Sequence, residues 1–153
     1  MSNSHQRKGT SSNSDVGRKF AVRVQKILEK EGFQVEPEYK IPCGLPFCEP
    51  KEHKFDFGSD SPRVIVECKS HTWTKNFNVP SAKMADWVRA MFYFHTAPSG
   101  YRKIFIVEQS VRPARARTEE ETLLNYFIRT QAHLIPRDVY LWELDDSDKL
   151  TRT

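Results

Sequence analysis

Apolar residues near the N-terminus recur every three or four positions, which is the spacing of one face of a helix. The run begins near Ser14, and Ser14 or Asp15 can cap its start. Gly32 stands where the residue just past the end of a helix commonly lies. The pattern therefore predicts a first helix whose apolar face consists of Val16, Phe20, Val24, Ile27 and Leu28.

Helical spacing returns twice later in the chain. Residues 82–95 carry a wide apolar face, typical of a helix that lies on a sheet, and Ser81 can cap this helix. Thr118 and Glu121 match a capping box, which predicts a third helix from Thr118 to about His133.

Five segments have the alternating or continuously apolar pattern of strands. The first contains Pro37, which cannot donate to a ladder, so we expect that strand at a sheet edge. The third and fourth are apolar without interruption, as in buried strands, and the helix between them makes a β-α-β crossover. The predicted order α-β-β-β-α-β-α-β is that of an α/β protein, with strands at 33–41, 54–58, 63–69, 103–108 and 139–144.

Length and composition favour one domain with one core. The 153 residues are close to the usual domain size of roughly 100–150 residues. Residues 1–13 are almost free of apolar side chains, so we expect a disordered tail ahead of a single domain at 14–153. A net charge of +4 permits a polyanionic partner without requiring one. Because there is neither an apolar run of the roughly 20 residues that span a membrane nor a signal-peptide centre, we expect a cytoplasmic protein without a membrane partner.

The three cysteines are too few for a disulfide framework, so reduced thiols are expected. Cys43 and Cys48 flank a short loop, and a zinc site can be imagined from them together with His53 and His71. Their spacing differs from the Cys-x2-Cys of zinc ribbons, which favours plain loop cysteines.

The third predicted strand ends in charges where a buried strand should avoid them. Side chains alternate between faces, so Glu67 and Lys69 lie on the same face. On the preceding strand Phe55 and Phe57 are expected to share a face. That leaves Asp56 on the opposite one, where hairpin pairing brings it towards Glu67.

Two carboxylates that meet in a partly desolvated place are unfavourable unless a positive group lies between them. Mg²⁺, or Mn²⁺ in its place, prefers oxygen ligands, so Asp56, Glu67 and the backbone carbonyl of Cys68 are the predicted metal ligands. Lys69 can orient or deprotonate a water that such an ion activates, which predicts a phosphodiester hydrolase. The alternative is an ordinary ion pair between Glu67 and Lys69 at a solvated strand end, with Asp56 facing solvent.

The pattern Asp56, ten residues, Glu67-Cys68-Lys69 on adjacent predicted strands resembles the motif of the PD-(D/E)XK nuclease superfamily, which has the restriction-endonuclease-like fold. The resemblance covers roughly residues 14–108. It implies an αβββαβ core with a central mixed sheet flanked by helices, to which the C-terminal helix and strand are an addition. It also implies that residues 14–153 form a nuclease-like domain in which Asp56 and Glu67 bind the metal and Lys69 positions the attacking water.

Two positions depart from the superfamily pattern. Phe55 precedes Asp56, where the motif has proline. Many members place a further glutamate on the first helix near the metal, whereas here that helix offers only Gln25 and the late Glu29. The second departure puts a two-metal mechanism in doubt.

Two segments are rich in side chains that suit nucleic-acid contacts. In the first, Trp73 is expected to stack on bases or else to belong to the core, and His71 assists at the phosphate or is an exposed loop residue. The second is a basic loop that suits phosphate contacts or is solvated surface. The predicted nucleic-acid-binding residues are Ser70, His71, Trp73, Lys75, Asn76, Arg112, Arg115 and Arg117.

These features together predict a Mg²⁺-dependent endonuclease that acts on DNA. A restriction-endonuclease-like enzyme is expected to work as a homodimer that cuts both strands. One alternative is a structure-specific repair or junction-resolving nuclease, which needs mainly shape and phosphate contacts. Another is a catalytically inactive nucleic-acid-binding module.

Overall fold

The first helix ends where the sequence predicts and begins slightly earlier. The computed structural model describes residues 13–153, so the predicted tail lies outside the described residues except for Asn13. Helix α1 spans Asn13–Lys30, which places the two predicted caps within its first turn. Gly32 has a φ of 93°. The N–H groups of Gly32 and Phe33 donate to the carbonyls of Glu29 and Leu28, which makes a Schellman motif.

A six-stranded mixed sheet forms the centre of the fold, in the order β1-β2-β3-β4-β7-β8. β1, β2 and β3 pair antiparallel, β3, β4 and β7 pair parallel, and β8 returns antiparallel to β7. β1 lies at one edge, as Pro37 predicts. The strands are β1 Glu36–Cys43, β2 Lys51–Asp60, β3 Arg63–Lys69, β4 Arg102–Glu108, β7 Val139–Leu144 and β8 Leu150–Arg152.

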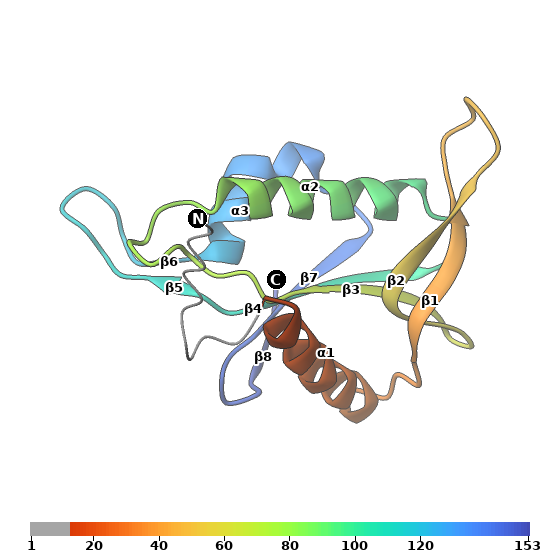
Figure 1. Ribbon diagram of the computed structural model, residues 1–153, viewed down its shortest axis with the longest axis horizontal. Helices are drawn as coiled ribbons and strands as arrows, with labels where there is room; N and C mark the ends of the chain where they lie inside the picture. Colours follow the sequence, from red (N-terminus) through yellow and green to blue (C-terminus); the bar gives the residue numbers. More distant parts are fainter. Residues whose placement is uncertain (1–12) are drawn as a thin grey trace, which may run out of the picture.

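The parallel strands determine where the helices lie. α2 (Ser81–Thr96) connects β3 to β4, and α3 (Leu123–Gln131) with the short 3-10 helix η1 (Ala132–Leu134) lies between β4 and β7. Both crossovers step across the sheet in the same direction, so right-handed connections place both helices on one face. α1 covers the opposite face (Figure 1). The predicted β-α-β crossover is confirmed by the parallel pairing of β3 with β4.

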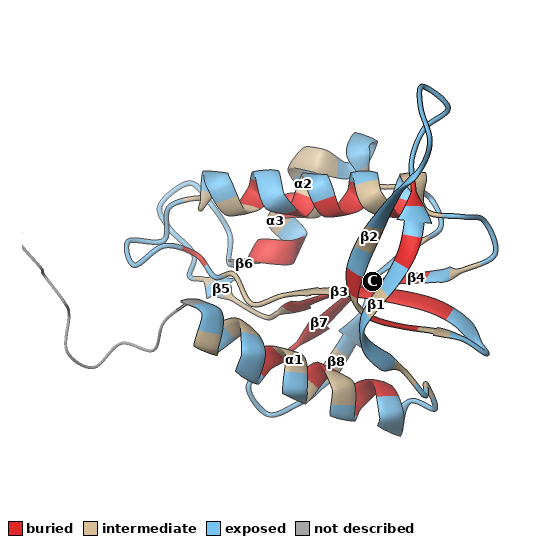
Figure 2. Ribbon diagram, turned by 45° about the vertical axis from the view of Figure 1, so that its right-hand side comes forward, coloured by how far each residue is buried: buried red, intermediate tan, exposed pale blue. Residues whose placement is uncertain are grey.

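Two apolar layers enclose the sheet, and buried residues line both of them (Figure 2). Ile65 and Phe105 face α2 and α3, where Trp87, Phe94 and Phe127 pack on them. On the other face, the side chains that pack against α1 include Phe57, Val64, Val66, Ile104, Ile106 and Trp142. The uninterrupted apolar runs of β3 and β4 supply both layers, as expected for strands buried on two sides.

Both predicted helix caps after the first helix are wrong. α2 is preceded by Pro80, without a side-chain cap, and Ser81 lies inside the helix. Thr118 lies in a tight turn, exchanging backbone hydrogen bonds with Arg115. α3 starts five residues later than predicted, where the Thr122 side chain accepts a hydrogen bond from the Asn125 N–H. The end of the segment that matches a capping box instead forms a strand of a two-stranded ribbon, made of β5 (Val111–Arg112) and β6 (Glu121–Thr122).

Candidate functional site

A break in the side-chain alternation of β2 turns Asp56 towards β3. Phe55 packs in the α2-facing layer and Phe57 in the α1-facing layer, so the prediction that they share a face is wrong. Glu38, which lies across from Asp56 in the β1–β2 register, has a φ of 53°, a value rare outside glycine. Asp56 Oδ2 accepts a hydrogen bond of 2.8 Å from the Cys68 N–H.

Glu67 and Lys69 lie next to each other on the face that alternation predicts. Lys69 Nζ is 3.2 Å from Glu67 Oε1, and the two side chains are 22% and 13% exposed, respectively. This ion pair is the contact that the structural alternative expects. That alternative also expects a solvated strand end with both groups open to water, whereas both side chains are largely buried.

The second carboxylate oxygen of Glu67 sets this pair apart from an ordinary ion pair. Within residues 13–153, Oε2 is buried and has no hydrogen-bond partner. Burial, and then the negative charge of Asp56, raises the pKa of Glu67 to about 7, although Lys69 and the nearby backbone N–H of Asp56 act in the opposite direction. An orphaned anionic oxygen next to a second carboxylate fits a site for a cation.

Cys68 lies between Glu67 and Lys69 on β3. Its side chain points into the α1-facing layer, and burial raises the pKa of the thiol well above its usual value. Its N–H donates towards Asp56. The N–H and C=O of one residue in an extended strand point to the same side, so the carbonyl of Cys68 is turned towards β2, as its predicted role requires.

Helix α1 covers the face opposite to Glu67 and Lys69, since its apolar stripe packs on the layer of Val64 and Val66. Gln25 and Glu29 therefore belong to a helix on the other face of the sheet. Helix α2 borders the site instead. A cavity of about 400 Å³ contains Glu67 and Lys69 together with His53, Asp86, Arg89, Ala90 and Tyr93.

These bordering residues were not predicted from the sequence as parts of a site. Asp86, Arg89 and Tyr93 follow one another at helical spacing on α2, beside its buried stripe. Their spacing is visible in the sequence and could have indicated a polar stripe. The rotation of α2 on the sheet, which brings that stripe to Glu67, is set by packing.

Ser70 and His71 line a separate groove of about 690 Å³, which Lys69 also borders. The Trp87 Nε1–H donates to His71 Nδ1 over 2.9 Å. Burial, and then the charges of Lys83 and Lys69, lowers the pKa of His71 to about 4. His71 is therefore a neutral, half-buried group, and its predicted role at a phosphate is limited to a hydrogen bond from Nε2.

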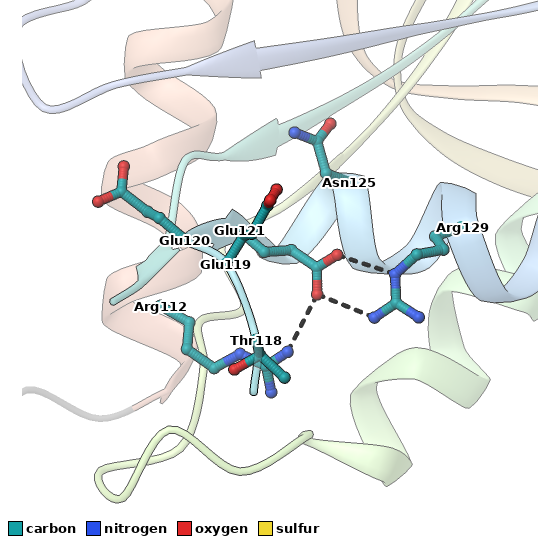
Figure 3. A pocket seen from close by; sticks show the side chains of 7 residues that line it. All are labelled: Arg112, Thr118, Glu119, Glu120, Glu121, Asn125 and Arg129. Atoms are coloured by element: carbon teal, nitrogen blue, oxygen red, sulfur yellow. Dashed lines mark hydrogen bonds and ion pairs between the residues drawn. The ribbon is translucent and has the colours of Figure 1, made fainter. Parts of the chain in front are cut away.

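Two predicted nucleic-acid contacts belong to the interior instead. Trp73 is 5% exposed, and its indole N–H donates to the Ser110 carbonyl over 3.0 Å, so the alternative that it belongs to the core is confirmed and base stacking is wrong. The guanidinium of Arg112 lies 4.0 Å from the Trp73 ring centroid and bonds to Glu121. Figure 3 shows Glu121 between Arg112 and Arg129, and its carboxylate accepts hydrogen bonds from both guanidinium groups. Arg112 thus helps to hold the ribbon, and its predicted phosphate contact stays a prediction.

The other predicted contacts gather at one end of the molecule. Lys75, Asn76, Arg115 and Arg117 are exposed. Arg115 donates to the Asn76 carbonyl over 2.7 Å and lies over the Phe77 ring, so the segment after β3 and the β5–β6 ribbon are side by side. This pair of segments, residues 74–78 and 113–118, is called the arm below. It projects beside the end of β3 (Figure 1).

The imagined zinc site is not assembled. Cys43 is buried in the α2-facing layer, Cys48 is exposed, and His53 stacks on Tyr93. Among residues 13–153 there is no cluster of three or more His, Cys, Asp or Glu side chains able to hold a metal. A cation at Asp56 and Glu67 would therefore need backbone oxygen, water or substrate oxygen as its further ligands.

Comparison of the chain with protein-family models, with curated proteins and with solved structures finds no match. The resemblance to the PD-(D/E)XK superfamily therefore remains a prediction that depends on the motif and the element order. Over residues 13–153, none of the helices combines the length and the apolar character needed to cross a membrane.

Proposed function

We propose that the chain is a metal-dependent endonuclease that hydrolyses phosphodiester bonds of DNA, with the restriction-endonuclease-like core and with Asp56, Glu67 and Lys69 at its centre. The observation that carries this proposal is the buried Oε2 atom of Glu67, which has no partner among the described residues and lies near Asp56. A buried carboxylate in this setting costs free energy until a cation neutralises it. The motif resemblance supports the same assignment.

The residues present fit a hard divalent ion. Asp56 and Glu67 offer carboxylate oxygens, and the carbonyl of Cys68 is a third candidate ligand, a set that suits Mg²⁺ or Mn²⁺. When bound, such an ion polarises a phosphoryl oxygen and lowers the pKa of a coordinated water. Lys69 holds its ammonium 3.2 Å from Glu67, where it can donate to the attacking water or to a phosphate oxygen.

A cleavage assay tests the proposal. The purified chain is incubated with supercoiled plasmid, linear, single-stranded and branched DNA, with Mg²⁺ or Mn²⁺, and the product ends are mapped. We expect cleavage that falls by about 100-fold or more in Lys69→Ala, the usual scale for losing one transition-state donor. Lys54→Ala is the matched control, because Lys54 is an exposed lysine that pairs with Glu38. If the unaltered chain binds DNA but cuts none of these substrates with either metal, the inactive binding module is the better assignment.

The type of endonuclease depends on the arm. Trp73 and Arg112, two of the predicted contacts, serve the interior, which leaves mainly Lys75, Asn76, Arg115 and Arg117 for DNA. This small exposed set favours shape and phosphate contacts over base reading, and so gives weight to the structure-specific alternative. Uniform product ends on plasmid indicate the restriction-like enzyme, and preference for branched DNA indicates the structure-specific one.

A homodimer is part of the restriction-like proposal, because one site cuts one strand at a time. Light scattering of the chain with and without DNA measures the oligomeric state. A dimer that produces double-strand breaks supports this form, whereas a monomer that only nicks supports the structure-specific enzyme.

A further inference from the structure

The cavity beside the proposed centre has further lining residues, to which the proposed roles of Asp56, Glu67 and Lys69 assign no function. It measures about 400 Å³, within the range of about 300–1,000 Å³ typical of small-ligand sites. One wall is the end of β3 with its carboxylate and ammonium, and the other is the polar stripe of α2. The stripe presents Asp86, Arg89 and Tyr93 at intervals of three and four residues.

Arg89 is a cation that the nearby carboxylate of Asp86 attracts without forming an ion pair. Its guanidinium lies 5.7 Å from the Tyr93 ring centroid and donates to Tyr93 Oη over 3.4 Å. Within residues 13–153 no carboxylate forms an ion pair with it. A planar guanidinium at the rim of a cavity is suited to bind a phosphate group through two parallel hydrogen bonds.

A flat aromatic wall completes the cavity. The His53 ring stacks on the Tyr93 ring, with centroids 3.6 Å apart and an interplanar angle of 11°. Phe55 supports the His53 ring edge-on from the core. Burial, and then the charge of Arg89, lowers the pKa of His53, so the wall is uncharged at neutral pH. Aromatic walls of this kind accept sugars and bases of any sequence.

We infer that this cavity binds one nucleotide unit of the strand that flanks the cleaved phosphate, with its phosphate on Arg89 and its sugar or base against the His53–Tyr93 pair. The inference rests on the proposed function, which places the cleaved phosphate at Lys69. Lys69 also borders the groove of about 690 Å³ that contains Ser70 and His71. A strand can therefore cross Lys69 from the cavity into that groove, towards the arm.

Binding measured without metal tests the inference independently of cleavage. A fluorescent single-stranded 12-mer is titrated in EDTA at several salt concentrations against the unaltered chain, Arg89→Ala and Arg89→Lys. Loss of one phosphate contact is expected to weaken binding about tenfold and to reduce the slope of log affinity against log salt by about 0.7. Arg89→Lys should keep the slope and lose only part of the affinity, because the charge remains while the bidentate geometry is lost.

Arg137→Ala is the matched control, since Arg137 is an exposed arginine that precedes β7, at the other end of the parallel strands. His53→Ala should weaken binding by about tenfold without changing the salt slope, because it removes stacking and no charge. If Arg89→Ala and Arg137→Ala bind the 12-mer equally, or if the unaltered chain does not bind it at low salt, the inference is wrong even where cleavage is observed.

A mononucleotide distinguishes a strand site from a site for free nucleotides. Thymidine 5′-monophosphate is used as the competitor against the labelled 12-mer. Competition only at concentrations far above those of an unlabelled 12-mer supports the strand assignment. Equal potency of the mononucleotide overturns it. Absence of cleavage together with Arg89-dependent binding would count against the proposed function alone.

Discussion

Replacing Glu67 with glutamine separates a functional carboxylate from a structural ion pair. If the pair with Lys69 exists to stabilise the fold, Glu67→Gln destabilises the protein. If the carboxylate is held at a cost for a cation, the same change stabilises the metal-free protein. The amide keeps the shape of the side chain and can still accept a hydrogen bond from Lys69, so the charge is the main difference.

The magnitude follows from the pKa of Glu67. Burial, and then Asp56, raises it from 4.5 to about 7. At about 1.4 kcal/mol per pH unit, ionised Glu67 costs the folded state about 3 kcal/mol at pH 8. This cost already includes the attraction of Lys69, which lowers the pKa of Glu67. We therefore expect Glu67→Gln to raise the free energy of unfolding by about 3 kcal/mol at pH 8.

The pH dependence has a definite sign. The folded-state pKa lies above the unfolded one, so the stability contributed by protonated Glu67 is fully present below pH 4.5 and is lost as the pH rises through 7. The advantage of Glu67→Gln should accordingly vanish below pH 4.5. Urea unfolding in EDTA across pH 4.5–8 measures it, with Glu52→Gln, an exposed carboxylate 4.0 Å from Lys40, as the control.

Mg²⁺ provides the second half of the test. Saturating metal should raise the melting temperature of the unaltered chain and leave that of Glu67→Gln unchanged, since a ligand that binds only the folded state stabilises it. A Glu67→Gln variant that is less stable than the parent in EDTA at pH 8, with no effect of Mg²⁺ on either, would refute the reasoning and leave a structural ion pair.

Two further predictions concern the surroundings of the site. Gly58→Ala should cost several kcal/mol in urea unfolding, because a Cβ there would lie 2.3 Å from Tyr39 Cδ1, whereas Gly17→Ala in α1, 3.9 Å from the nearest side chain, should be neutral or stabilising by up to about 1 kcal/mol. His71, whose pKa is lowered to about 4, should make stability fall as the pH drops from 6.5 to 4, by about 1–2 kcal/mol after allowance for its partial exposure. His71→Gln, which keeps an acceptor for Trp87, should remove that slope, and an unchanged slope would contradict the role of His71.

The central strands were predictable because their apolar runs are unambiguous. The predicted bounds of β3 and β7 coincide with the observed ones, and β4 differs by one residue. β8 escaped prediction because its three residues include only one apolar side chain, Leu150, and it forms by pairing with β7. The β5–β6 ribbon likewise depends on Arg112 and Glu121 meeting across the chain, which a local pattern does not reveal.

In the candidate site, too, some residue positions were predictable from the sequence and others were not. Glu67 and Lys69 share a face because alternation is a local property of a regular strand. Asp56 approaches them where the alternation of β2 breaks, because Phe55 and Phe57 pack in opposite layers, and the sequence pattern does not reveal this break. Trp73 was misplaced because an aromatic residue in a polar segment has the same local pattern whether it folds inward or outward. Its burial is decided by Ser110 and Arg112, which lie far along the chain.

The position of Glu67 explains how the fold tolerates an unfavourable carboxylate. β3 is an interior strand, paired with β2 and β4 and covered by apolar layers on both faces. In the parallel ladder of β3 with β4, Glu67 pairs with Phe105, so the sheet fixes the backbone that carries this carboxylate. The sheet therefore holds the backbone of Glu67 in place, and the proposed cation would neutralise the carboxylate without movement of that backbone, as the proposed preorganised site requires.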